Sequence, residues 1–264
     1  HVEDDGNGFA SATNNSKVWI LNAGIAVDKE GGLIIDSIDT SWLKIIPTST
    51  IQLKQKPSNI TEDTNYSDDT LTVIQTDIKS NASNRNNLTK VGNGTIVVSK
   101  NNGDNPNGIH VHGSLKIDSV KITSWNPETN DYAITNEDGT IPRPFIRAEP
   151  EATDTIDIIN SEIAYLGYGV QVKEDNNKRR SGIVYYGGDN SMIKGNRIHH
   201  NMFGFYSNGV GNITIENNAI HNNVHYGLDP HTGTHDMIIR NNRVYDNGGI
   251  GIICSLDCFN ITIE

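Results

Sequence analysis

The feature of this sequence that most constrains its fold is a short repeat in the second half of the chain. The repeat reads Ile-x-x-Asn-x-Ile/Val-x-x-Asn and begins at Ile193, Ile215 and Ile239, with a period of 22 and then 24 residues. Weaker copies begin at Ile117 and Ile158. A regular period of this length is typical of solenoid proteins, in which each coil contacts mainly its two neighbours.

The residue types within the repeat decide which solenoid it forms. A helical repeat needs two amphipathic helices in each unit, whereas these 22 to 24 residues are rich in Asn, Gly and β-branched side chains. Such residues favour tight turns and strands. In a parallel β-helix the Ile and Val of each coil point inward, and the corner Asn stacks on the Asn of the next coil. We therefore predict an all-β fold, a right-handed parallel β-helix.

The chain divides into two parts at residue 93. Residues 1–93 are expected to supply N-terminal coils and polar loops or a cap, and residues 94–264 the β-helix core, interrupted by an insertion at 173–181. The last residues, 260–264, repeat 212–216 and stop before the Asn corner. Because a β-helix should not end on a bare apolar strand edge, we expect the native protein to continue or a partner to cover this end.

Charge and composition exclude some classes of partner. The formal net charge of −11 argues against binding nucleic acid, although a locally basic groove could still hold an acidic substrate. The sequence has no apolar run of membrane length and starts at His1, as in a processed soluble chain. Eight Asn-x-Ser/Thr sequons agree with an extracellular, periplasmic or cell-surface glycoprotein, but an Asn-rich chain produces many by chance. Cys254 and Cys258 form either a local disulfide or two thiols at a coil corner.

Aligning the coils on Gly169, Gly204, Gly227 and Gly251 gives three columns of strand residues. The first column is apolar and is predicted to be core: Val170, Phe205, Leu228 and Ile252. The second is Gln171, Tyr206, Asp229 and Ile253, and the third is Lys173, Asn208, His231 and Ser255. Strand alternation places the second and third columns on one outer face, where they would line a groove along the solenoid axis that suits a polymer.

The segment His225–His235 holds the strongest candidates for chemistry. Histidine as a residue type titrates near neutrality, and a tyrosine close to a cation can give or take a proton, so His231 and Tyr226 form a candidate acid/base pair. Asp229 would orient the imidazole or hydrogen-bond a substrate carboxyl. Strict alternation points Tyr226 inward, so it reaches the groove only if the chain bends at Gly227. The alternative interpretation is that Tyr226 is core and Asp229 belongs to a corner turn.

The run Tyr226-Gly-Leu-Asp-Pro-His231 resembles the Tyr-Gly-x-Asp-Pro-His motif of the mannuronan C5-epimerases, which are right-handed parallel β-helices acting on alginate-type polyuronates. Residues 164–168 and 203–206 also resemble the coils before that motif in the periplasmic branch, and the likeness covers roughly 113–264. The resemblance implies proton abstraction at C5 of a uronate and reprotonation from the opposite face. It assigns His231 as base, Tyr226 as acid and Asp229 as substrate-positioning carboxyl.

Two positions depart from the family pattern. Thr232 stands where the periplasmic branch usually has a second acidic residue, and Leu256 stands near the place of an arginine that neutralises the uronate carboxylate. Without that charge, proton removal builds a dianion. Lys173, Arg179 or Arg180 would have to supply it, unless an arginine lies beyond residue 264 or the activity is weak. The alternative interpretation of residues 178–180 is a solvated loop tip. The candidate substrate-binding residues are Lys173, Gln171, Tyr206, Asn208, Arg179, Arg180, His225 and His235.

Two rival functions remain open at this stage. The same carbanion can expel the C4 oxygen, which would make the protein a polysaccharide lyase. A non-catalytic glycan-binding or surface-layer β-helix would use the same groove. No cofactor is required by the sequence: His231 with His235 and Asp236, His110 with His112, or His199 with His200 give no complete metal shell. Calcium at Asp-rich turns stays open, although no acidic repeat has the spacing of a calcium loop.

Overall fold

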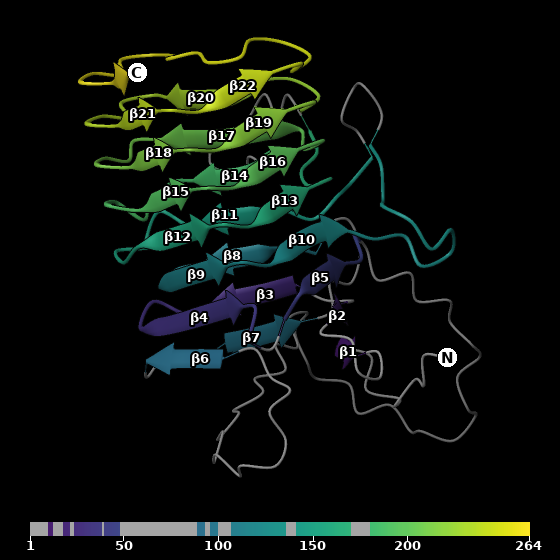
Figure 1. Cartoon of the computed structure of the whole chain (residues 1–264). Coiled ribbons are helices and arrows are strands. Elements are labelled where there is room, and N and C mark those ends of the chain that lie inside the picture. Colours follow the sequence, from purple (N-terminus) through teal and green to yellow (C-terminus); the bar gives the residue numbers. More distant parts are fainter. Residues whose placement is uncertain are drawn as a thin grey trace, which may run out of the picture.

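The computed structural model describes residues 10–12, 18–21, 24–38, 40–47, 89–92, 96–99, 107–135, 141–169 and 180–264. These residues form strands and turns, with no helix among them, arranged as three sheets that run the length of the molecule (Figure 1). Within the described ranges there is accordingly no helix long and apolar enough to cross a membrane.

The three sheets are named here by their strands. Sheet A holds β1 (Ala10–Ala12), β2 (Val18–Leu21), β5 (Trp42–Ile45), β10 (Lys121–Ser124), β13 (Glu162–Ala164), β16 (Arg197–His199), β19 (Ala219–His221) and β22 (Arg243–Tyr245). Sheet B holds β7 (Ile96–Ser99), β3 (Gly24–Val27), β8 (Ile109–Val111), β11 (Ile146–Ala148), β14 (Gly182–Tyr185), β17 (Phe203–Asn208) and β20 (Leu228–His231). Sheet C holds β6 (Thr89–Gly92), β4 (Gly31–Asp36), β9 (Ser114–Asp118), β12 (Ile156–Ile159), β15 (Met192–Lys194), β18 (Thr214–Glu216), β21 (Ile238–Arg240) and β23 (Thr262–Ile263).

Each coil visits sheets B, C and A in turn, and each strand pairs in parallel with its equivalent in the next coil, as in β17 with β20 and β18 with β21. The exceptions are β1, β6 and β7, which pair antiparallel with their neighbours at the N-terminal end of the stack. The predicted parallel β-helix is therefore confirmed. The predicted boundary at residue 93 falls in 93–95, outside the described residues.

The isoleucines of the repeat form continuous rows inside the solenoid. Ile117, Ile158, Ile193 and Ile215 lie side by side in sheet C, and all four are fully buried. Burying such a side chain stabilises the fold by roughly 1.5–3 kcal/mol. The weak and the strong copies of the sequence repeat thus belong to one series of coils, as predicted.

The corner asparagines form ladders between coils. The Asn218 Oδ1 accepts hydrogen bonds from the Asn196 backbone N–H at 2.8 Å and side-chain amide at 3.0 Å, and the Asn218 amide donates to Asn242 at 2.9 Å. A second ladder runs through the next corner, where Asn223 accepts from the Asn201 backbone at 3.0 Å. These side chains satisfy backbone groups that the turns leave without strand partners.

The Asn-Asn pairs of the sequence combine two roles. Asn217, Asn222 and Asn241 each precede a ladder residue and adopt the left-handed backbone, with φ of 58°, 52° and 55°. Asn tolerates this conformation better than most residues other than Gly. The first residue of each pair therefore makes the turn, and the second supplies the ladder amide.

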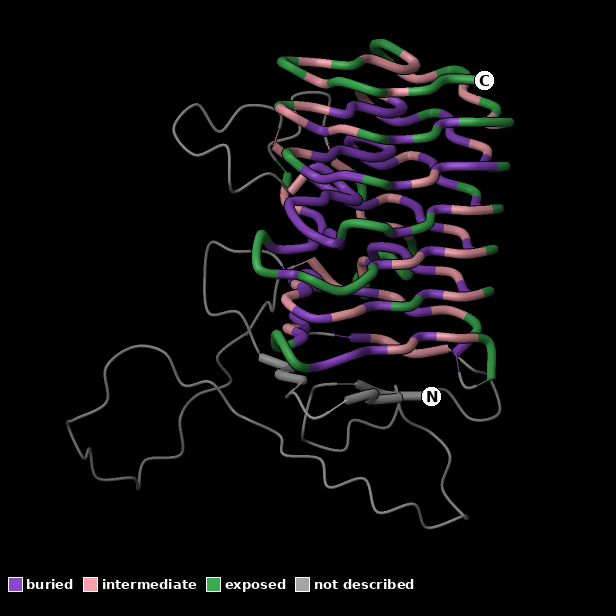
Figure 2. The backbone as a smooth tube through the Cα atoms, turned by 90° about the vertical axis from the view of Figure 1, so that its left-hand side faces the viewer, coloured by how far each residue is buried: buried purple, intermediate pink, exposed green. Residues whose placement is uncertain are grey.

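Burial decreases toward the C-terminal end of the stack. In Figure 2 the central coils are largely buried, whereas the coils near the C-terminus are mainly intermediate or exposed. Leu256, Phe259 and Ile263 are 65%, 53% and 54% exposed. The last coil thus presents apolar side chains and unpaired strand edges, as the sequence predicts.

Candidate functional site

The candidate residues lie on the outer face of sheet B. Phe205 and Leu228 pair across β17 and β20 and point into the core, where both are fully buried. Because side chains alternate along a strand, the intervening Tyr206 and Asp229, which also pair, point outward. The predicted columns are therefore confirmed for these two coils, and Asn208 pairs with His231 as expected.

The predicted register is wrong one coil earlier. The strand beside β17 is β14, in which Val184 pairs with Tyr206, so Val184 occupies the place assigned to Gln171. Tyr168, just before the aligned Gly169, instead forms an antiparallel bridge with Arg180 at the base of the insertion. Gln171, Lys173 and Arg179 themselves lie outside the described residues.

Tyr226 lies outside the core, in the bend that precedes β20. Its half-buried ring packs on Phe203 at 5.1 Å between ring centroids and belongs to a small apolar cluster with Val184, Met202 and Tyr206. Gly227 permits this path: a Cβ there would collide with the backbone carbonyl of Gly251 and lie 2.7 Å from a Val244 methyl. The bend that the sequence left open is thus present, and Tyr226 packs against this second cluster rather than within the main core of the solenoid.

His231 is partly exposed at the end of β20. Its ring lies 5.4 Å from the Tyr206 ring, and Nδ1 is 2.5 Å from the Thr232 hydroxyl. If Nδ1 carries the proton and donates it to Thr232 Oγ1, the lone pair resides on Nε2. In that tautomer Nε2 is the atom able to accept a proton.

Asp229 is 1% exposed although it belongs to the outer face. Its carboxylate accepts a hydrogen bond from Ser255 Oγ of the next coil at 3.2 Å. Tyr206, which pairs with it across the strands, is also fully buried and accepts a hydrogen bond on its hydroxyl from the Asn208 amide at 3.2 Å. These contacts fix the positions of the polar side chains beside His231.

The other two candidate histidines differ in their placement. His225 lies next to Tyr226, its Nε2 is buried without a hydrogen-bond partner, and burial lowers its pKa. His235 instead stacks on Phe259 at 4.9 Å, and its Nδ1 is 2.8 Å from an Asp236 carboxylate oxygen. His235 is therefore part of a corner stack.

Arg180 is the one candidate cation of the insertion within the described residues. Its Nη1 donates to the Tyr168 hydroxyl at 2.7 Å, and its guanidinium lies 5.8 Å from the Phe145 ring. Arg180 Nε is buried without a hydrogen-bond partner. Burial raises the pKa of Tyr168, and the positive charge of Arg180 opposes that effect.

Sequence reasoning missed a charged cluster on the same face. Arg147 pairs with Val184 and with His110, so it continues the column of Tyr206 and Asp229. Its Nη2 lies 2.9 Å from Glu149, its guanidinium lies over the Tyr186 ring at 5.1 Å, and its Nε is buried without a partner. His110 Nδ1 is 2.6 Å from the other Glu149 oxygen, and this contact together with the charge of Arg147 holds the pKa of Glu149 below its usual range despite burial. The alternation Ile146-Arg147-Ala148-Glu149 could have revealed the cluster.

Of the metal sets considered from the sequence, His199 contacts His200 and His235 contacts Asp236, but His110 and His112 are not brought together. His110 contacts Glu149, whereas His112 lies 3.5 Å from Glu151, so the two histidines have separate partners. Across the described ranges, no group of three His, Cys, Asp or Glu side chains is arranged to hold a metal ion. Cys254 and Cys258 are both free thiols.

Comparison with known proteins places these coils among established β-helices. The family model of the right handed beta helix region matches residues 146–264. The mannuronan C5-epimerase of Pseudomonas putida is 28% identical over 141 residues, which make up 50% of this chain and 26% of the relative. The mannuronan C5-epimerase of Pseudomonas fluorescens is 27% identical over 139 residues, with the same coverage of 50% and 26%. The match thus spans about a quarter of these curated relatives.

Solved structures show the same fold over nearly the whole chain. A variant of the periplasmic alginate epimerase AlgG aligns with 96% of this chain and 47% of its own, at a TM-score of 0.65 and 19% identity. The unsubstituted AlgG aligns with 97% and 53%, at a TM-score of 0.56 and 13% identity. The solenoid is therefore a right-handed parallel β-helix, as predicted, and the resemblance noted in the sequence is confirmed.

Proposed function

We propose that this chain, a right-handed β-helix similar to the mannuronan C5-epimerases, epimerises mannuronate residues of an alginate-like polysaccharide at C5. The observation that carries the proposal is the placement of Tyr226, Asp229 and His231 on one outer face of sheet B, with Tyr226 outside the core. Had the Tyr226 ring been sealed inside the coil, no acid/base pair would exist on this face.

The chemistry requires a base and an acid on opposite sides of one sugar ring. In the proposed reaction His231 Nε2 removes the C5 proton, with Nδ1–H held by Thr232 Oγ1 at 2.5 Å. The Tyr226 hydroxyl then delivers a proton to the other face of C5. Asp229, which accepts a hydrogen bond from Ser255 Oγ at 3.2 Å, positions the sugar.

The substrate carboxylate next to C5 needs a cation, because charge builds on it when the proton leaves. Arg180 is our candidate among the described residues. It lies two residues before Gly182, which pairs with Phe203, the residue on whose ring Tyr226 packs. Arg147 lies three strands from Asp229, or about 14 Å at the usual strand spacing, and would contact a sugar further along the polymer.

The test is proton NMR of polymannuronate incubated with the protein in heavy water. Wild type should exchange H5 for deuterium and produce guluronate without cutting the chain, whereas His231→Phe should lose at least about a hundredfold in rate, as general-base removal does. Unchanged H5 signals with wild type would overturn the proposal for this substrate. Ultraviolet absorbance from an unsaturated uronate would show β-elimination instead, and binding that survives His231→Phe with no exchange in either protein would identify a glycan-binding module.

Two further substitutions assign the neighbouring roles. Arg180→Ala should lower kcat far more than Arg180→Lys, because lysine keeps the positive charge, while His235→Ala, in the corner stack, should leave the rate unchanged. Equal loss in Arg180→Ala and Arg180→Lys would mean that the shape of the guanidinium, rather than its charge, matters. The polysaccharide substrate and the periplasmic relatives support a location outside the cytoplasm for this chain as well.

A further inference from the structure

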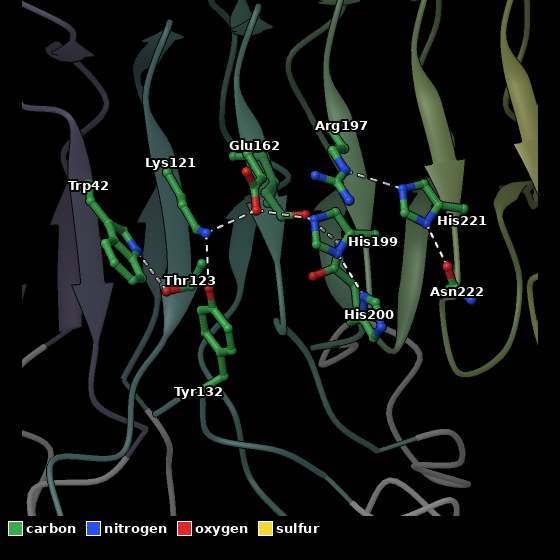
Figure 3. A network of polar contacts seen from close by, with 12 residues as sticks. Trp42, Lys121, Thr123, Tyr132, Glu162, Arg197, His199, His200, His221 and Asn222 are labelled. Atoms are coloured by element: carbon green, nitrogen blue, oxygen red, sulfur yellow. Dashed lines mark hydrogen bonds and ion pairs between the residues drawn. The ribbon is translucent and has the colours of Figure 1, made fainter. Parts of the chain in front are cut away.

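The outer face of sheet A forms a second polar surface that the proposed reaction does not use. Strands β5, β10, β13, β16, β19 and β22 lie side by side there, and most of their outward side chains are charged or aromatic (Figure 3). We call these outward side chains the sheet A strip. Two rows of the strip, one charged and one aromatic, run along the solenoid axis.

The charged row places a cation on every second strand. Lys121 pairs with Glu162, Glu162 with Arg197, Arg197 with Ala219, and Ala219 with Arg243. At the usual strand spacing the cations therefore repeat about every 10 Å. Glu162 is the one carboxylate of this row, and Lys121 Nζ lies 3.1 Å from it.

The two arginines of this row are available to a ligand. Both are exposed, and neither is ion-paired with any of the residues that the structure describes. Arg197 Nε donates to His221 Nε2 at 3.4 Å, and the Arg243 guanidinium lies 5.5 Å from the Tyr245 ring. In a chain with a net charge of −11, this strip is a locally positive surface.

The second row consists of rings stacked nearly parallel. His199 and His221 are 5.0 Å apart with 7° between their planes, and His221 and Tyr245 are 4.8 Å apart with 13°. A similar pile at the edge of the sheet joins Tyr132 to Tyr165 at 4.2 Å and 6°. Toward the N-terminal end, Lys44 Nζ lies 3.3 Å from the Trp125 ring centroid.

We propose that the sheet A strip is a non-catalytic binding surface for a linear acidic polysaccharide that runs along the solenoid axis. Guanidinium groups bind carboxylates through two hydrogen bonds. The faces of the stacked rings are covered by one another, so this row offers the edges of its rings beside the bound chain. In an extended 1,4-linked uronate chain alternate sugars face opposite sides, so carboxylates on one side recur at every second sugar. A cation on every second strand suits that pattern. The identification of the polymer as a polyuronate rests on the proposed function. The role of the sheet A strip as a binding surface for an acidic polymer does not.

The three tryptophans of the chain make the test direct. Trp42 and Trp125 lie at the strip, Trp19 is in β2 of the same sheet, and the strands of sheet B contain none. Fluorescently silent polymannuronate is titrated into the full chain, and tryptophan emission is recorded. We expect a saturable change, and Arg197→Glu with Arg243→Glu should weaken the apparent affinity roughly tenfold, a few-fold for each arginine–carboxylate pair removed. Lys29→Glu with Lys116→Glu, which alters two exposed cations elsewhere, is the matched control and should bind as wild type.

Several results would overturn the proposal. These are an absent emission change, equal affinity of wild type and the arginine variant, or tighter binding of a single-stranded oligonucleotide than of the polyuronate. Exchange of H5 in short oligomannuronates is measured in parallel and should be unaffected by the arginine variant. Arginine-dependent polymer binding without any H5 exchange would refute the proposed function and support the binding role of the sheet A strip. H5 exchange with polymer binding that does not depend on the arginines would support the proposed function and refute the binding role of the strip.

Discussion

At the scale of single residues, the site depends on how Thr232 holds His231. The hydroxyl lies 2.5 Å from Nδ1 and fixes the tautomer, but it carries no charge to stabilise the imidazolium that forms when Nε2 accepts a proton. A carboxylate in this place does both, as in the Asp–His pairs of many enzymes. Thr232 is therefore a weaker partner than the acidic residue usual in the periplasmic relatives.

We predict that Thr232→Asp raises the pKa of His231, so the acid limb of the kcat/KM profile moves to higher pH. Thr232→Val, which keeps the shape but cannot hydrogen-bond, should lower kcat by about fivefold, since one orienting hydrogen bond contributes about 1 kcal/mol. The pH profile of H5 exchange measures both effects. An acid limb that does not move in Thr232→Asp would show that His231 is not the titrating base.

His199 supports a prediction about acid stability. It is 5% exposed in sheet A, and burial lowers its pKa from 6.5 to about 4 although Glu162 opposes the shift. A histidine whose folded pKa is depressed contributes stability above its unfolded pKa, and that stability is lost as the pH falls from 6.5 toward 4.

The expected size of this effect is about 2 kcal/mol once solvent screening of the side chain is allowed for. His199→Gln should therefore make the free energy of unfolding less dependent on pH between pH 6.5 and 4. Denaturant unfolding of both proteins at several pH values measures this pH dependence. A slope as steep as that of wild type would assign the acid sensitivity to other groups.

At the scale of the element, the Asn ladder ties each coil to the next. Asn218 is 2% exposed; it accepts from the Asn196 backbone at 2.8 Å and donates to the Ile193 carbonyl at 2.9 Å. Asn218→Ala would leave both groups buried without partners, at a cost of about 2–4 kcal/mol. Asn217→Gly is the control, because glycine accepts its φ of 58° and should change the stability little. Thermal unfolding distinguishes the two, and an equal melting temperature for Asn218→Ala and wild type would contradict the structural role of the ladder.

The sequence predicted the coils and two rows of the site because glycine, asparagine and isoleucine recur at fixed places in consecutive coils. Gly204 and Gly227 align because a Cβ on either would meet the backbone carbonyl of the glycine above it. Gly169, with φ of 70°, is instead a turn glycine before an insertion. The sequence alone does not distinguish a glycine required by close coil packing from a glycine required by a turn. Arg147 escaped prediction since no glycine stands directly before its strand β11 to set the register.

At the scale of the whole molecule, the exposed last coil predicts self-association. Sheet C ends at β23, whose Ile263 is 54% exposed, and Phe259 beside it is 53% exposed. Unpaired edges with apolar side chains favour edge-to-edge contact. We expect the 264-residue chain to form dimers or larger species at high concentration, and Phe259→Asp with Ile263→Asp to shift it toward monomer. Analytical ultracentrifugation over a range of protein concentrations measures the oligomeric state, and a monomer at every concentration would contradict the prediction.

Pro230 in β20 has a consequence for how this molecule opens. Its carbonyl accepts from the Ser255 backbone at 2.9 Å, but proline has no N–H to donate to the coil above. The pairing between β20 and residues 252–255 of the next coil consists of isolated bridges, at Leu228 with Ile252 and at His231 with Ser255. Opening of the structure between β20 and these residues would break the hydrogen bond from the Ser255 hydroxyl to Asp229 and expose that carboxylate.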